Sequence, residues 1–211
     1  VNNLIKWFED YRLVAAIRCN SADDAEEMIK AAKVGGFRLF EISMQSPQAI
    51  RIIENHAKEE DVLYGASAIT DGEMAQRAIN AGAKFLSTYY IDRDVINIAK
   101  NSESFVITSA MTPTEAVQAH QAGSDLVQIY PVSTMEGPAY IRTIRKTLPF
   151  LKLAASGGVT LDNVYEYLRH CVAVCVNKAL FEKSLIRRAD WLSVTEGARC
   201  FTEKVESLKV S

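Results

Sequence analysis

Short apolar runs alternate along the chain with longer segments in which apolar residues recur every three or four positions. Such runs are typical of buried strands, and the longer period is typical of amphipathic helices. The apolar runs are RLVAAIRC (12–19), FRLFEIS (37–43), VLYGAS (62–67), KFLSTYY (84–90), SFVITS (104–109), DLVQIYP (125–131), FLKLAAS (150–156) and CVAVCV (171–176). The helix-like segments include SADDAEEMIKAAK (21–33), SPQAIRIIENHAK (46–58), DGEMAQRAIN (71–80), TPTEAVQAH (112–120) and GPAYIRTIRK (137–146), several of which open on a Ser, Asp or Thr cap.

Three of these junctions repeat one pattern, in which an alanine-rich helix end is closed by glycine and followed by an apolar strand. The glycines are Gly36, Gly82 and Gly123. A glycine after a helix followed by a strand is typical of a βαβ unit. The intervals between the glycines are about twice one such unit, so another strand is expected between each pair.

Eight short βα units in a chain of 211 residues predict a single domain over 1–211. Its predicted fold is α/β, a compact (β/α)8 TIM barrel with an N-terminal helix before strand one. A doubly wound open sheet is the alternative, and the even spacing and the lack of a GxGxxG turn weigh against it.

Equivalent positions after the three glycines share one face of their strands. Leu39, Phe85 and Leu126 form one set, Glu41, Ser87 and Gln128 the next, and Ser43, Tyr89 and Tyr130 a third nearer the strand ends. Because side chains alternate along a strand, the second set is expected to meet inside the barrel near its C-terminal mouth, where barrel active sites lie. A structural hydrogen-bond network is the alternative to a functional site there.

Other strand ends add polar residues to the predicted mouth, namely Arg18, Ser67, Ser109 and Ser156. Arg18 suits a carboxylate or phosphate ligand, although it could also pair with Glu41 or extend into solvent.

The sequence SGG at 156–158 follows the predicted seventh strand, where barrels commonly bind phosphate through backbone N–H groups. Its glycines, Gly157 and Gly158, could instead simply turn the chain. Lys178 lies beside this loop in the predicted fold, as a solvated lysine, an anion contact or a reactive amine.

The composition limits the classes of partner that are expected. The formal net charge is −2 and there is no long run of Lys or Arg, so nucleic acid and anionic membranes are not expected as partners and small molecules are. No apolar run reaches the roughly 18 residues that span a bilayer, and the expected location is the cytoplasm.

The four cysteines are scattered and are expected to be reduced, with no metal site. The three histidines fall in helical or loop contexts, which gives a Ser-His-Asp triad little support.

The chain resembles the family of 2-keto-3-deoxy-6-phosphogluconate and 4-hydroxy-2-oxoglutarate aldolases (KDPG/KHG aldolases). The resemblance covers about Leu13 to Leu185 and is carried by ADDAEEMIKAAKVGGFRLFEIS, AINAGAKFLST, MTPTEAVQAHQAGSDLVQIYPV and AASGGVTLDNVYEYL in the right order. It implies a class I aldolase without a cofactor, which cleaves a phosphorylated keto sugar acid through a lysine Schiff base, and it implies a homotrimer.

The chain departs from the family's residues at the centre of the site. The family's Schiff-base lysine, in a pattern like VKFFPA, matches Gln128 in VQIYPV, and an amide cannot form an iminium. Glu41 matches the family's proton-transferring glutamate, Gln45 replaces its carboxylate-binding arginine, and Arg18 matches an arginine that a subset carries on strand one.

Other positions of the motifs are kept only in part. The resemblance matches Ser156 to the threonine of the family's PTGG, and places Asn177, Lys178 and Ala179 where the family has a GGS phosphate motif.

Three functions are therefore open. The leading interpretation is an aldolase-family protein that binds a small 2-keto acid or a phosphorylated sugar acid, without aldol cleavage through position 128. The second is a diverged lyase or isomerase that uses Glu41 with Lys178 or with a hydrogen bond from Gln128. The third is a ligand-binding or regulatory protein without turnover. Ser67 and Tyr130 are further candidate substrate contacts.

Overall fold

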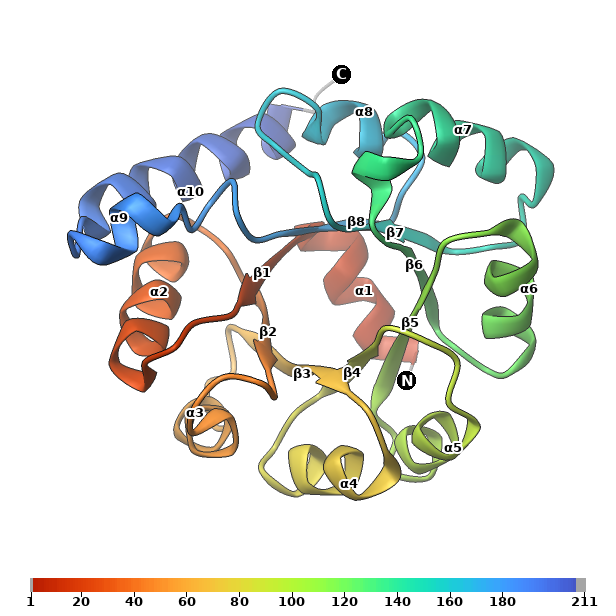
Figure 1. The fold of residues 1–211 in the computed structure, drawn as a ribbon, viewed down its shortest axis with the longest axis horizontal. Helices are drawn as coiled ribbons and strands as arrows, with labels where there is room; N and C mark the ends of the chain where they lie inside the picture. The colour runs from red at the N-terminus through yellow and green to blue at the C-terminus, as the bar shows by residue number, and fades with distance from the viewer. Residues whose placement is uncertain (1, 208–211) are drawn as a thin grey trace.

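Within residues 2–207, the part of the chain that the computed structural model describes, eight parallel strands close into a barrel (Figure 1). The strands are β1 (Leu13–Ile17), β2 (Leu39–Ser43), β3 (Leu63–Ile69), β4 (Phe85–Thr88), β5 (Phe105–Ala110), β6 (Leu126–Ile129), β7 (Leu153–Ala155) and β8 (Ala173–Val176). Each pairs with its neighbours in chain order, and β8 pairs with β1. The predicted (β/α)8 barrel is confirmed, and the open sheet is excluded.

Helices surround the barrel and follow the strands in sequence. They are α1 (Asn2–Tyr11), α2 (Ala22–Val34), α3 (Ala49–His56), α4 (Gly72–Asn80), α5 (Arg93–Asn101), α6 (Pro113–Gln121), the 3-10 turn η1 (Val132–Thr134), α7 (Pro138–Thr147), α8 (Val164–Leu168), α9 (Lys183–Arg187) and α10 (Trp191–Glu206). The N-terminal helix predicted before strand one is α1. In the described part of the chain, no helix combines the length and the hydropathy needed to cross a bilayer.

The ends of the helices follow from local hydrogen bonds. Ser21 caps α2 by accepting from the Asp24 amide, and Thr112 forms a capping box with Glu115 on α6. After α2, α4 and α6 the three repeat glycines have φ angles of +102°, +104° and +105°, which residues with a side chain rarely adopt. The repeat seen in the sequence is thus three copies of one helix-ending geometry.

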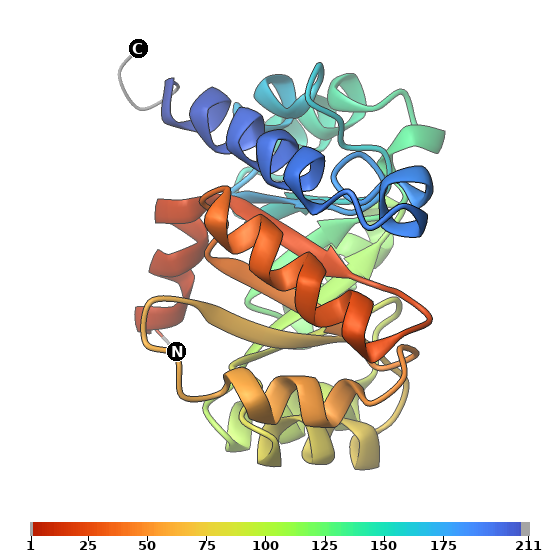
Figure 2. The same ribbon diagram turned by 90° about the vertical axis from the view of Figure 1, so that its left-hand side faces the viewer.

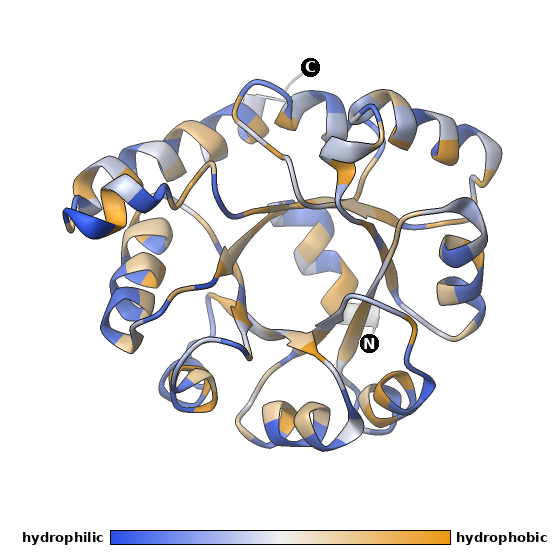
Figure 3. Ribbon diagram, viewed as in Figure 1, coloured by the Kyte–Doolittle hydropathy of each residue, from blue (hydrophilic) through white to orange (hydrophobic). Residues whose placement is uncertain are grey.

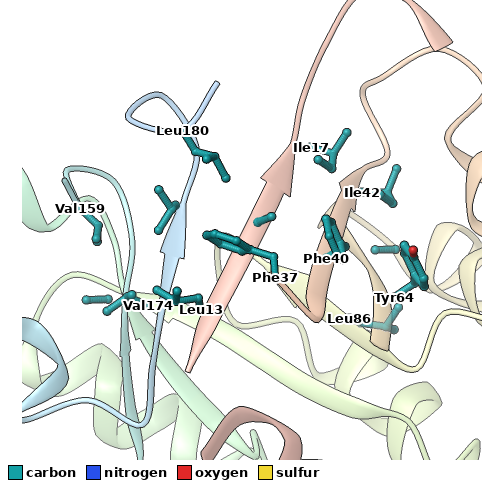
Figure 4. Packing of buried hydrophobic residues seen from close by; sticks show 14 of the residues in the cluster. Leu13, Ile17, Phe37, Phe40, Ile42, Tyr64, Leu86, Val159, Val174 and Leu180 are labelled. Carbon is teal, nitrogen blue, oxygen red and sulfur yellow. The ribbon is translucent and has the colours of Figure 1, made fainter. Parts of the chain in front are cut away.

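Alternation along the strands divides the apolar residues into two cores. The outward residues form the larger core together with buried helix residues, and Figure 4 shows Ile17 of β1 lying beside Phe40 and Ile42 of β2 in it. The inward residues fill the barrel and include Leu39, Phe85 and Leu126. These three residues are the first interior set expected from the repeat. Figure 3 shows the strands as mainly hydrophobic and the helices as two-sided.

Helix α1 lies across the N-terminal end of the barrel (Figures 1 and 2). Its Phe8 is fully buried, with ring centroids 4.7 Å from Phe105 and 5.3 Å from Phe85. Room for Phe85 comes from Gly65 on β3, where an added Cβ would lie 2.5 Å from the Phe85 ring. The N-terminal half of the barrel is therefore filled with aromatic side chains, and the space for a ligand is confined to the opposite end.

Three aromatic residues in or near the C-terminal helix pack within their own chain. Phe181 and Phe201 belong to the outer core, and Trp191 is half-buried against it. They give no support to an intersubunit face, and the homotrimer stays a prediction.

We expect Phe8→Ala to lower the free energy of unfolding by about 3–5 kcal/mol, because it removes a ring from the filled end of the barrel and leaves a cavity. Urea denaturation monitored by circular dichroism measures this loss. Tyr11→Ala, on the same helix but at a side chain that is 41% exposed, is the matched control and should cost much less. Equal losses for the two variants would contradict the conclusion that Phe8 of α1 fills the N-terminal end of the barrel.

Candidate active site

A cavity of about 710 Å³ opens at the C-terminal end of the strands. Its lining contains ten of the residues that the sequence singled out: Arg18, Glu41, Ser67, Gln128, Tyr130, Ser156, Gly157, Gly158, Asn177 and Lys178. Tyr89 also lines it, with its ring centroid 5.2 Å from that of Tyr130. Gln45 is absent from the lining. The barrel mouth thus gathers polar groups from most of the strand ends.

Glu41 and Gln128 reach the cavity because they lie two residues beyond the inward residues Leu39 and Leu126 on their strands. Both are buried. The Gln128 Nε2 donates to Ser109 Oγ at 3.2 Å on the neighbouring strand β5, with which Gln128 is in register. A primary amide nitrogen carries two hydrogens, so this contact leaves a second N–H for a ligand oxygen.

The two oxygens of the Glu41 carboxyl group differ in their hydrogen bonding. Its Oε1 accepts a hydrogen bond from the Cys175 thiol, with Sγ 3.3 Å away, and its Oε2 is buried without a partner within residues 2–207. Desolvation raises the pKa of Glu41 to about 7, although the thiol hydrogen bond opposes the shift. A carboxyl group with this pKa can accept and release a proton near neutrality.

Arg18 and Gln45 contact each other at the rim. The Arg18 guanidinium donates to Gln45 Oε1, and the backbone N–H of Gln45 donates to Ser43 Oγ at 3.3 Å. Both Arg18 and Gln45 are exposed. Arg18 lines the cavity and therefore has the place for an anion contact, whereas Gln45 acts on the cavity through Arg18.

The loop 156–158 turns its carbonyl groups into the protein. Ser156 O accepts from Val132 N at 2.9 Å, Gly157 O from Ser133 N at 3.0 Å, and Gly158 O from Asn163 Nδ2 at 2.9 Å. Because C=O and the following N–H point in opposite directions across a trans peptide, the N–H groups of the next three residues point away from these partners. The loop lines the cavity, and successive backbone N–H groups that point to one side can bind an anion.

Gly157 and Gly158 also have a packing role, because they let the loop lie close to its neighbours. A Cβ on Gly157 would lie 2.9 Å from the Tyr130 ring, and one on Gly158 would lie 2.5 Å from Ser133 Cβ. Their φ angles of +76° and +130° are further reasons for glycine. The loop thus needs glycine to fit against the β6 loop, whether or not it binds phosphate.

Asn177 and Lys178 directly follow strand β8. The Asn177 side chain is hydrogen-bonded to the barrel backbone, since its Nδ2 donates to Ala16 O at 2.6 Å. Lys178 is exposed at the rim, and the exposed Glu182 shares the cavity lining with it. This position suits an anion contact better than a buried nucleophile, which needs a neutral amine.

Some residues lie apart from where the sequence pointed. Ser87 and Ser109 are buried but do not line the cavity. In the described chain no histidine is among the lining residues, and no cluster of three or more His, Cys, Asp or Glu side chains could hold a metal ion.

Sequence reasoning missed the role of Cys175, which it treated as one of four scattered thiols. Cys175 lies on β8 two residues before Asn177, so the alternation that identified Glu41 and Gln128 was available to place it inside the barrel.

Comparison with known proteins agrees with this geometry. Residues 4–197 match the family model described as KDPG and KHG aldolase. A curated probable 2-dehydro-3-deoxy-6-phosphogalactonate aldolase of Rhizobium meliloti is 31% identical over 158 residues, which are 74% of each chain. A 2-dehydro-3-deoxy-phosphogluconate aldolase of Pseudomonas aeruginosa is 25% identical over 190 residues, which are 89% of this chain and 86% of that protein.

Solved structures show the same fold. A structure described as native KDPGal superposes with a TM-score of 0.83 at 26% identity and covers 94% of this chain and 96% of its own. The KDPG aldolase of Legionella pneumophila, with pyruvate captured as a covalent carbinolamine, has a TM-score of 0.85 at 21% identity, covering 94% of this chain and 97% of its own.

We expect Glu41→Gln to stabilise the fold relative to the parent protein by about 3 kcal/mol more at pH 8 than at pH 4. The folded-state pKa of Glu41 is raised above the usual carboxyl value, so the folded protein holds this proton more tightly than the unfolded chain. Stability is therefore lost as the pH rises from about 4.5 to about 7, and the variant lacks this loss. Urea denaturation across the pH range measures the difference.

Glu115→Gln is the control, because backbone hydrogen bonds from the capping box lower the pKa of Glu115. Its substitution should have the opposite sign and cost stability once the carboxyl group of the parent protein is ionised. A Glu41→Gln difference that is independent of pH would contradict the buried, proton-holding state of this group.

Proposed function

The chain belongs to the KDPG and KHG aldolase family, and from this premise we propose that it binds a 2-keto acid and moves the proton on the carbon beside the keto group without forming a Schiff base. The observation that carries the proposal is the cavity in which the Glu41 carboxyl group, with a pKa of about 7, and the Gln128 amide are both buried. The proposal is a lyase- or isomerase-type enolisation.

The proposed ligand is a small 2-keto acid or a phosphorylated 2-keto-3-deoxy sugar acid. The names of the relatives support this class, since they describe aldolases of 2-dehydro-3-deoxy-phosphogluconate and of the corresponding phosphogalactonate. The positions of charge in the cavity support it too. Arg18 at the rim suits the carboxylate, and the amides after Ser156, together with Lys178, suit the phosphate.

In the proposed reaction Glu41, ionised, removes a proton from C3 of the keto acid. The electron pair of the broken C–H bond forms the C2–C3 double bond, and the carbonyl electrons move to the oxygen on C2. The second N–H of Gln128 donates to this developing oxyanion, as neutral amides do in oxyanion holes. Return of the proton from Glu41 to C3 completes an exchange. In a cleavage Glu41 would instead take the proton of the C4 hydroxyl, the C3–C4 bond would break to release C4 as an aldehyde, and its electron pair would form the same C2–C3 double bond.

Lys178 is not given the role of a replacement nucleophile in this proposal. Its amine is exposed at the rim, whereas imine formation requires an amine next to the buried carbonyl carbon. The homotrimer implied by the family resemblance is kept as a proposal without an assigned surface.

We expect the protein to exchange the C3 protons of pyruvate for deuterium in D₂O, because Glu41 can take and return them near neutral pH. Loss of the methyl signal in proton NMR measures the rate. Glu41→Gln should slow the exchange by at least about 100-fold, since it removes the base while leaving the cavity filled. Treatment with pyruvate and borohydride should leave the protein mass unchanged.

The outcomes separate the three candidate functions. A borohydride adduct on Lys178 would contradict the proposal and assign the nucleophile to that residue. Tight binding of the keto acid in calorimetry, without exchange, would overturn the proposal in favour of a ligand-binding protein.

We expect Gln128→Lys to form a borohydride-trapped adduct with pyruvate at position 128, because burial lowers the pKa of a lysine placed there and leaves part of it neutral. Aldol cleavage should be weak, since the family's arginine at position 45 is absent. Gln128→Met is the control of similar size and should give no adduct. A folded Gln128→Lys variant that is not labelled by pyruvate would show that the keto group does not approach this position.

A further inference from the structure

We propose that Cys175 is a positioning residue for Glu41: its thiol holds one carboxyl oxygen inside the barrel, so that the other oxygen is presented for proton transfer. This inference deepens the proposed function and rests on it for the chemistry. The contact itself is a property of the fold and can be tested without a substrate.

The contact depends on a small residue between the two strands. β2 and β8 both pair with β1, so Glu41 and Cys175 are separated by one strand. The cavity-lining residue of β1 at this level is Ala16, which is in register with Glu41. Cys175 is in register with Val14, one inward position earlier on β1, and the short side chain of Ala16 does not separate Cys175 Sγ from Glu41 Oε1, which lie 3.3 Å apart.

The thiol acts as a donor in this contact. Burial and the neighbouring carboxyl group raise the pKa of Cys175 well above its usual range, so the sulfur keeps its proton. Ser156 opposes this rise in the pKa of Cys175, and both residues line the cavity. A protonated thiol that donates to Oε1 engages one oxygen of the buried carboxyl group and leaves Oε2 without a partner within residues 2–207.

Few other charged or titratable groups face Glu41. Burial, and next the charge of Glu41, raise the pKa of Tyr89 to about 12, which places that phenol near the carboxyl group, and Arg18 and Tyr130 lie beyond it around the same cavity. Lys178 and Glu182 are at the exposed rim. Within the described residues, Cys175 is the partner that bonds Glu41 directly, and it is therefore the group whose removal changes the carboxyl most.

The direct test is the NMR titration of carbon-13-labelled Glu41 in the ligand-free protein. Cys175→Ala should raise the midpoint of Glu41 by about half a unit to one unit, because the lost hydrogen bond stabilised the ionised form. Cys175→Ser keeps a donor and should return the midpoint toward that of the parent protein. The pH profile of pyruvate exchange should shift in the same direction in each variant, with the rate of Cys175→Ala at pH 7 lower by about two- to five-fold.

Cys171→Ala is the matched control, since Cys171 is also a buried thiol just before β8 but does not line the cavity. It should leave both the Glu41 midpoint and the exchange profile unchanged. A Glu41 midpoint that is the same in Cys175→Ala and the parent would overturn the inference even if exchange is observed. A parent protein without exchange, but with the predicted midpoint shifts, would remove the proposed function and keep the positioning contact.

Discussion

Closure of the sheet decides which side chains can reach the interior of this protein. In a closed parallel barrel each strand sends alternate residues inward, and the enclosed space has room for only a few layers of them. One end of that space is taken by Phe85, Phe105 and the Phe8 ring of α1. Inward positions beyond this layer lie near a cavity that opens at the other end, and there polar residues such as Glu41 and Gln128 replace apolar ones.

The glycine-anchored repeat made this layering predictable from the sequence. Once three strands are aligned by Gly36, Gly82 and Gly123, the period of two assigns Leu39 and Glu41 to the same face without further information. The same period could not show that Gln45 would turn to Arg18, since both side chains are long and exposed and their contact depends on rotamers. It also could not show that Gly157 and Gly158 are needed against Tyr130 and Ser133, because that contact joins loops far apart in sequence.

The chemical type of a residue also limits how well its role can be predicted from the sequence. Glu41 draws attention in the sequence because a buried carboxyl group is unusual, whereas a buried cysteine is ordinary in a core. The contact between Glu41 and Cys175 depends on how β2 and β8 are aligned with β1 and on the small size of Ala16. The sequence of one strand alone does not reveal this alignment. The partner of an unusual residue is therefore harder to predict than the residue itself.

The residue at position 128 and the state of Glu41 are physically connected. A lysine in the buried layer would add a positive charge to the cavity and favour the ionised form of a nearby carboxyl group. The amide of Gln128 adds no charge, and Glu41 Oε2 finds no compensating donor within residues 2–207, so desolvation dominates and holds the pKa near 7. Such a group is poorly suited to support a cationic iminium as a permanent anion. It is well suited to carry one proton back and forth, and the neutral Gln128 amide matches a neutral-to-anionic reaction better than a cationic one.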